Sequence, residues 1–289
     1  MKLPPPHRVL PRSTHWPSAL DDLDDPPASF DCVGVLDDAP RVGIVGTRRA
    51  DASANRFAHR LARELAERGI TIVSGGALGI DASAHRGALE TTAGRTIAVL
   101  ASGFARPYPR SHGPLFEQIA ERGALIHEDH PAQSKSRFLF RNRLIAALSD
   151  VVVVVQAPRK SGALSTAYHA LAMNRPLLVV PVAPWDKRGE GNLTLLDRPE
   201  ATLCTSSARV LEALGMSSPK KRTKKTKTTK KKQAKNASSA LYELLSAEPQ
   251  SLDALAEASG RAVAELNLEL LRLLLAGEAL ETPQGWIAT

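Results

Sequence analysis

Three short segments of this chain place small residues beside arginine or lysine, and each lies between an apolar run and an amphipathic run. They are residues 46–49, 74–79 and 160–162. At a strand-to-helix junction, small residues leave backbone N–H groups free for a phosphate, and a nearby guanidinium or ammonium adds charge. The segments therefore predict phosphate binding. For residues 46–49 taken alone, an ordinary turn with solvated arginines is an equal alternative.

The second segment has three glycines within five residues, directly before a predicted helix, and this pattern predicts a backbone cradle. Neither G-x-G-x-x-G nor G-x-x-x-x-G-K-[ST] occurs in the chain, which favours binding without a dinucleotide and without ATP hydrolysis. Asp81 and His85 are four residues apart and could form an acid/base pair. We favour the alternative in which Asp81 caps the helix and His85 makes a structural hydrogen bond.

Residues 137–143 combine arginine with phenylalanine, and charge together with aromatic stacking is typical of sites for single-stranded nucleic acid. In a helix, Arg137 and Arg141 share one face. We expect Arg141 to be the better phosphate ligand and Arg143 to form an internal ion pair. In the alternative interpretation, Phe138 and Phe140 belong to the core and the arginines are surface charges.

The elements that must position these residues alternate between strands and helices. Apolar runs rich in β-branched residues predict strands at 42–45, 70–73, 96–100, 151–155 and 177–180. Amphipathic segments that end at Gly or Asn predict helices at 52–68, 81–92, 115–122 and 164–173, and a further helix precedes residue 151. This order predicts an α/β fold with an extended Rossmann-like, doubly wound, mostly parallel sheet.

In such a sheet the loops that follow the strands meet at one edge, so the separate segments are expected to form a joint site. The predicted DNA- or phosphate-binding residues are Arg48, Ser74, Gly75, Gly76, Arg137, Arg141, Asn142, Lys160, Ser161 and Gly162.

The positive charge of the chain is unevenly distributed. The whole chain has a formal net charge of +8, but residues 220–235 hold ten Lys or Arg and no acidic residue. Residues 236–289 contain eight acidic and two basic residues, a net charge of −6. Residues 1–219, with 26 basic and 22 acidic residues, have a net charge of +4. The overall charge is therefore no guide to the binding site.

Composition divides the chain into four parts. Residues 1–40 are a Pro-rich lead-in, 41–216 the Rossmann-like domain, and 217–235 a Lys-rich tether predicted to be disordered. In residues 236–289, predicted helices at 239–246, 251–258 and 262–276 with a hairpin at 280–288 indicate a winged helix. The negative charge of this segment disfavours DNA binding, because the DNA-recognition helices of winged-helix proteins carry basic and amide side chains. We therefore predict a protein-binding or regulatory module.

No run of 18 apolar residues and no secretory signal pattern is present, and the two cysteines are isolated in the sequence. These features predict a cytoplasmic protein. His127 and His130 flank two acidic residues, but we favour a structural or incidental role over a metal site. No cofactor is predicted.

The chain resembles the DprA/Smf family of DNA-processing proteins over roughly residues 16–201 and again at its C-terminus. The segments that carry the resemblance are Trp16-Pro17, residues 24–27, 44–48, 74–81 with 84–85, 96–100, Tyr108-Pro109, 140–143 and 160–164. The resemblance implies a homodimer that binds single-stranded DNA without strong sequence preference. It also implies protection of incoming DNA and loading of the RecA recombinase in natural transformation, without catalysis.

This chain departs from the family pattern at four places. Leu78 stands where the family usually has Arg, Asp51 lies near its usual Ser, Gln156 replaces Glu, and Glu200-Ala201 lies near its usual Gly-Ala pair. A rival function is nucleotide cleavage by a phosphoribohydrolase-like enzyme, but its P-G-G-x-G-T-x-x-E signature is absent. A transcriptional regulator built on the winged helix is disfavoured by the acidity of residues 236–289.

Overall fold

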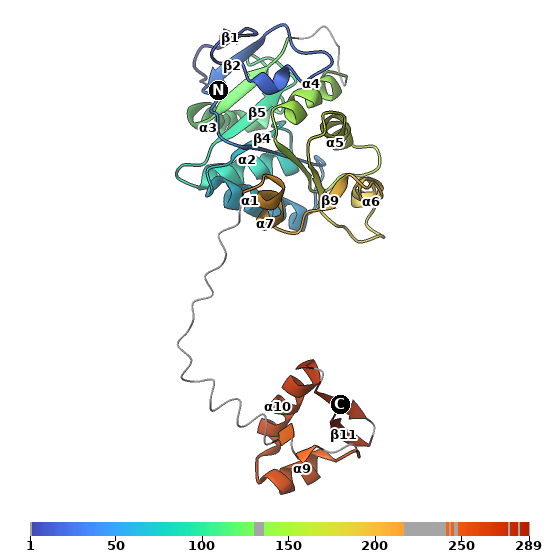
Figure 1. Ribbon diagram of the computed structural model, residues 1–289. Coiled ribbons are helices and arrows are strands. Elements are labelled where there is room, and N and C mark those ends of the chain that lie inside the picture. The colour runs from blue at the N-terminus through green and yellow to red at the C-terminus, as the bar shows by residue number, and fades with distance from the viewer. Residues whose placement is uncertain are drawn as a thin grey trace. The chain divides into compact units, whose positions relative to one another are not determined.

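The computed structural model describes residues 2–129 and 136–216, and between 241 and 288 all but residues 243, 246, 247, 277 and 283. The chain divides into two compact units, Met1–Ser218 and Pro219–Thr289 (Figure 1). The predicted tether at 217–235 lies outside the described residues. No helix among those described has the length and apolar character that a membrane crossing requires.

The first unit is built on one nine-stranded sheet in the order β1-β2-β6-β5-β4-β3-β7-β8-β9. Strands β3 to β9 pair in parallel, while β2 pairs antiparallel with both β1 and β6. The strands are β1 (His7–Val9), β2 (Phe30–Gly34), β3 (Arg41–Val45), β4 (Thr71–Ser74), β5 (Thr96–Leu100), β6 (Ala124–His127), β7 (Val151–Val154), β8 (Leu177–Val179) and β9 (Ala201–Leu203). The predicted mostly parallel α/β sheet is confirmed.

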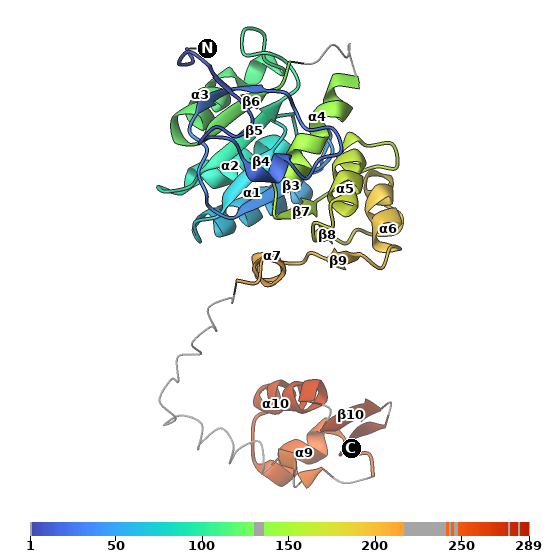
Figure 2. The ribbon, with the colours of Figure 1, turned by 45° about the horizontal axis from the view of Figure 1, so that its top comes forward.

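Helices cover both faces of this sheet (Figures 1 and 2). They are α1 (Ala52–Ala66), α2 (Ile80–Glu90), α3 (Gly113–Arg122), α4 (Ser136–Ala147), α5 (Gly162–Ala172), α6 (Glu190–Leu196) and α7 (Ser207–Ala213), with short 3-10 helices at Ser18–Leu20, Arg110–His112 and Lys187–Gly189. Successive strand residues point to opposite faces. Val151 and Val153 accordingly join the cluster under α1 and α2, whereas Val152 and Val154 join the cluster under α4 and α5.

The order of the strands reverses between β3 and β7. The chain runs outward from β3 through β4, β5 and β6, and then returns to place β7 on the other side of β3. The loops that follow β3 and β7 therefore diverge, which opens a crevice at the carboxyl edge of the sheet.

The first 40 residues, predicted as a separate lead-in, contribute β1 and β2 to this same sheet and belong to the first compact unit. Val9, Leu20 and Phe30 are buried in the cluster that also holds residues of α4 and α5. These strands were missed because β1 is a three-residue edge strand and β2 is only five residues long, so neither shows a long apolar run in the sequence.

The second unit contains α9 (Leu252–Ser259), α10 (Val263–Ala276), β10 (Ala279–Thr282) and β11 (Gly285–Ala288) around a small leucine-rich core. Gly260 ends α9 with a φ of 64°, the left-handed conformation that glycine favours. Two of the three predicted helices and the predicted hairpin are present. The remaining predicted helix, 239–246, falls partly outside the described residues.

Candidate functional site

A cavity of about 490 Å³ lies in the crevice between the loops that follow β3 and β7. Its walls come from the β3–α1 loop, the β7–α5 loop and α4, and Ala77 and Asp81 of the glycine-rich segment also line it. Of the predicted residues, the lining includes Arg48, Arg141, Asn142, Lys160, Ser161 and Gly162.

The cations that reach the solvent side of this cavity are Arg48, Arg49 and Lys160, and all three side chains are exposed. The lining contains one carboxylate, that of Asp81, and it is buried. The exposed part of the lining is therefore positively charged and suits an anionic ligand.

The amino terminus of α5 forms one wall of the cavity. Ser161 caps this helix by accepting a hydrogen bond from the Ala163 N–H at 3.2 Å. Asn142 Nδ2 donates to the Gly162 carbonyl oxygen at 2.9 Å and so ties the cap to α4. The wall presents the positive end of a helix dipole beside Lys160, an arrangement that binds phosphate.

Two aromatic rings lie beside Arg48, and one of them, Phe138, lines the cavity. The Arg48 guanidinium carbon lies 4.6 Å from the Phe138 ring centroid and 5.6 Å from that of Tyr108. The two rings meet edge to face at 5.5 Å, and Tyr108 is 45% exposed. An arginine stacked on exposed rings can hold both a phosphate and a base. The contact of Tyr108 with Arg48 and Phe138 could not be inferred from its sequence position, in a loop thirty residues before Phe138.

Arg141 has a different role from the one predicted. Its side chain is buried, with 7% of the residue exposed, and Nη1 donates to the carbonyl oxygens of Gly75, at 2.8 Å, and Val99. Burial lowers the pKa of Arg141 to about 10, so the guanidinium stays protonated at neutral pH. Arg141 therefore braces the ends of β4 and β5 and is not the solvent-facing phosphate ligand expected from the sequence.

Asp81 is the buried partner of Arg141 and does not cap α2. Gly79 occupies the cap position without a side-chain bond, while Asp81 Oδ2 accepts from the Ala77 N–H at 3.3 Å. Burial raises the pKa of Asp81, an effect that the positive charge of Arg141 opposes. The Asp81 carboxylate therefore hydrogen-bonds to the backbone of the glycine-rich loop and not to the amino terminus of α2.

His85 is a structural residue, as predicted. Its Nδ1 lies 2.7 Å from Thr96 Oγ1, and burial lowers the pKa of His85 to about 3, which keeps the ring neutral. The ring is fully buried, so it is not available to a ligand as an acid or a base.

The first three residues of the glycine-rich loop are closed to direct ligand contact. Ser74, Gly75 and Gly76 are buried, and Ser74 Oγ donates to the Ile44 carbonyl oxygen at 2.6 Å. A Cβ added to Gly75 would lie 2.5 Å from Arg141 Nη2 and 2.7 Å from Asp81 Oδ2. The expected cradle is corrected for these residues: Gly75 makes room for the Arg141 and Asp81 side chains, Phe116 and Leu100 fill the space beside Gly76, and a phosphate has no access to either glycine.

The two other arginines of α4, Arg143 and Arg137, lie outside the lining of the cavity. Arg143 forms the expected internal ion pair, with Nη1 and Nη2 lying 2.7 and 2.8 Å from the two Glu128 carboxylate oxygens. Arg137 is exposed but lines a small hollow beside His127 and not the main cavity. Among the described residues, no group of three His, Cys, Asp or Glu side chains could hold a metal ion, and His130 lies outside them.

The fold and the site define a Rossmann-like protein with a positively charged cavity at the carboxyl edge of its sheet and an appended helix-and-hairpin unit. Residues 7–215 match the family model of DNA recombination-mediator protein A, and residues 225–285 match the DprA winged helix domain. The chain belongs to this family.

Relatives and solved structures agree with this assignment. The chain is 45% identical over 180 residues to a putative DNA processing protein DprA of Mycobacterium tuberculosis, covering 61% of this chain and 46% of the relative. It is 31% identical to protein Smf of Escherichia coli over 98% of this chain and 78% of the relative. The chain spans about half the length of the first curated relatives it matches.

Two solved structures of DNA processing protein A share the fold. The Streptococcus pneumoniae protein gives a TM-score of 0.66 at 31% identity, covering 73% of this chain and 74% of that one. The Helicobacter pylori protein, whose structure concerns its single-stranded DNA binding mode, gives a TM-score of 0.62 at 34% identity. The match covers 72% of this chain and 95% of that one.

Proposed function

We propose that this chain binds single-stranded DNA and acts as a DNA-processing protein of the DprA type. The observation that carries the proposal is that exposed Arg48, Arg49 and Lys160 lie together with the half-buried ring of Phe138 and the exposed ring of Tyr108, where the order of the strands reverses between β3 and β7. Cations contact the phosphates of any sequence, while rings stack only on bases that are free of a duplex. The arrangement therefore favours single strands without base-specific reading.

The Lys-rich run at 220–235 is expected to add salt-sensitive affinity that is independent of strand type. Deleting residues 220–235 should lower the salt dependence of binding and leave the preference for single-stranded over double-stranded DNA intact. Gel shifts of both DNA forms over a series of salt concentrations measure the two quantities separately. If the deletion variant lost its preference for single strands, the cavity at the edge of the sheet would not be what distinguishes single-stranded from double-stranded DNA.

We also propose that the protein acts in the cytoplasm as a homodimer that loads a RecA-type recombinase during natural transformation. Family membership supports this role, and both cysteines, Cys32 and Cys204, are free and buried. Adding the chain should raise RecA ATPase activity on single strands that are covered by a single-strand-binding protein. Light scattering on the same sample gives the oligomeric state, and an unchanged ATPase rate would remove the loading role.

We propose a binding protein and not an enzyme. The carboxylate in the described lining, Asp81, is buried against Ala77 and Arg141, where it is poorly placed to act on a nucleotide. The second unit stays a predicted protein-binding module, and its α10 exposes Leu268 and Leu271, which are unsuited to phosphate contact. Release of base or sugar from nucleoside monophosphates would favour the rival hydrolase.

A further inference from the structure

A second and larger groove, of about 1300 Å³, opens beside the first unit's α1. One wall is formed by the outer sides of α1 and α2, and the other by the segment that follows β8. The phosphate cavity is lined by residues 45–49 and the second groove begins at Asp51, so a single residue, Ala50, separates their linings along the chain. The two linings therefore lie next to each other at the start of α1.

The helical wall of the groove is basic. Arg56 and Arg60 lie one turn apart on α1, and Arg86 projects from α2; all three are exposed. Within the described part of the chain, Arg56 and Arg86 have no ion-pair partner, and the contact of Arg60 with Glu64 is 3.9 Å long. A solvent-exposed pair at this distance contributes little. These guanidinium groups are therefore available to an anionic ligand.

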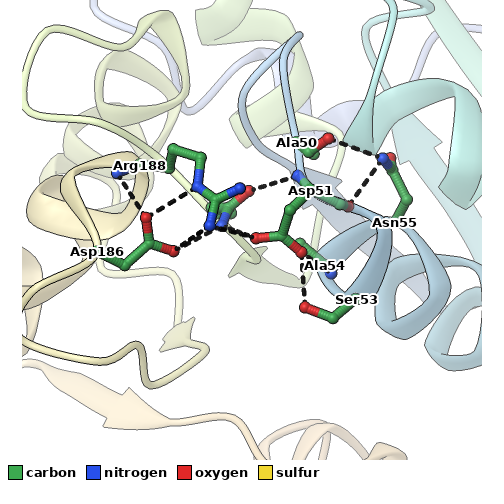
Figure 3. A network of polar contacts seen from close by, with 8 residues as sticks. Ala50, Asp51, Ser53, Ala54, Asn55, Asp186 and Arg188 are labelled. Carbon is green, nitrogen blue, oxygen red and sulfur yellow. Dashed lines mark hydrogen bonds and ion pairs between the residues drawn. The ribbon is translucent and has the colours of Figure 1, made fainter.

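Two carboxylates also line the groove, Asp51 at the start of α1 and Asp186 in the segment that follows β8, and both are already paired with Arg188. Figure 3 shows Arg188 between Asp186 and Asp51: its Nε lies 2.9 Å from Asp186 Oδ1 and its Nη2 lies 3.5 Å from Asp51 Oδ2. Gln156 Nε2 donates to Asp51 Oδ2 at 2.6 Å. Hydrogen bonds from the Ser53 hydroxyl and the Ala54 N–H hold the pKa of Asp51 well below its usual range.

This network fixes the segment that follows β8 to the start of α1, and that segment carries Trp185. The Trp185 side chain is 85% exposed, whereas Trp16 stacks on Phe30 and Trp286 is buried in the second unit. Trp185 is not itself a lining residue, but Ala183 and Asp186, on either side of it in the chain, line the groove, so an exposed ring lies at the margin of the groove. Aromatic rings beside guanidinium groups form the stacking platforms of sites for single-stranded nucleic acid.

We propose that this groove binds a second stretch of the single strand held in the phosphate cavity, with Arg56 and Arg86 contacting phosphates and Trp185 stacking on a base. The assignment rests on the proposed function and extends it, because it makes affinity depend on oligonucleotide length. An acidic segment of a partner protein is the alternative ligand, because it would also pair with these arginines. The strand is favoured because the groove adjoins the phosphate cavity and because an exposed ring suits a base.

The test compares oligothymidylates of about 6 and about 20 nucleotides, lengths that bracket the range of single-strand sites. In the full chain, Arg56→Ala combined with Arg86→Ala should weaken the long oligomer about tenfold and leave the short one unchanged. The matched control, Arg68→Ala with Arg209→Ala, removes two exposed arginines outside both grooves and should change neither affinity by more than about twofold.

Trp185 supplies an independent readout. The long oligomer should quench its fluorescence and the short one should not; Trp185→Phe should abolish the quenching while keeping most of the affinity. Equal losses for both lengths, no loss for either, or quenching by polyglutamate but not by the long oligomer would overturn the assignment. If the wild-type chain binds neither oligomer, the proposed function fails instead, and polyglutamate quenching would then assign the groove to acidic protein.

Discussion

Replacing Arg141 with methionine is expected to destabilise the first unit by about 3–5 kcal/mol at neutral pH, the usual cost of removing one member of a buried charged pair. The variant leaves Asp81 buried without its cation and leaves the Gly75 and Val99 carbonyl oxygens without a donor. Urea unfolding followed by circular dichroism measures the loss. A variant as stable as the wild type would contradict the structural role of Arg141.

The pH dependence of this loss has a defined sign. Burial raises the folded-state pKa of Asp81, and removing Arg141 takes away the positive charge that opposes the rise. A group whose pKa is higher in the folded state binds more protons there, so the fold gains stability at low pH and loses it as the pH rises through that pKa. The deficit of Arg141→Met should therefore shrink as the pH falls from 7 towards about 4. A pH-independent deficit would exclude this cause.

A second variant separates charge burial from packing. Adding Asp81→Leu to Arg141→Met replaces the charged pair with two apolar side chains and should recover part of the lost stability. Further destabilisation by the double substitution would indicate that shape, and not the uncompensated charge, dominates at this position.

Combining Arg48→Ala with Lys160→Ala is expected to weaken binding of single-stranded DNA about 100-fold without unfolding the protein. Each hydrogen bond to a charged group is worth about 1.5–3 kcal/mol, and about 1.4 kcal/mol corresponds to a tenfold change. Both side chains are exposed, so stability should hold. Losing two phosphate contacts should also reduce the slope of log affinity against log salt by about 1.4.

Fluorescence anisotropy of a labelled oligomer checks the affinity, and the Arg68→Ala with Arg209→Ala variant controls for net charge. Unchanged affinity in Arg48→Ala with Lys160→Ala would refute the proposed site. Arg141 is unsuitable for this test, because its loss would lower affinity by disturbing the fold.

The sheet and the meeting of its loops could be predicted from the sequence. Runs such as 151–155 are continuously apolar because both faces of the strand are covered, and parallel strands bring their carboxyl ends to one edge whatever lies between them. Arg48, Lys160, Ser161 and Gly162 needed only this rule to be placed together.

The role of Arg141 could not be predicted, because helical periodicity gives the face of a residue but not what covers that face. The amino-terminal turn of α4 is exposed at Arg137, whereas Arg141, Asn142 and Arg143 one turn later are all buried. Nor does the sequence reveal that Gly75 lacks a side chain to make room for Arg141 and not for a ligand. Both facts depend on packing between segments that are 66 residues apart.

The Arg141 brace has a consequence for the rate at which a ligand is captured. Because one guanidinium joins the carbonyl ends of β4 and β5, and Asn142 joins α4 to the cap of α5, the edge is rigid before any ligand arrives. A preorganised surface loses little conformational entropy on association, so that cost falls on the flexible strand. Capture should then proceed at the diffusional encounter rate, without a preceding isomerisation of the protein.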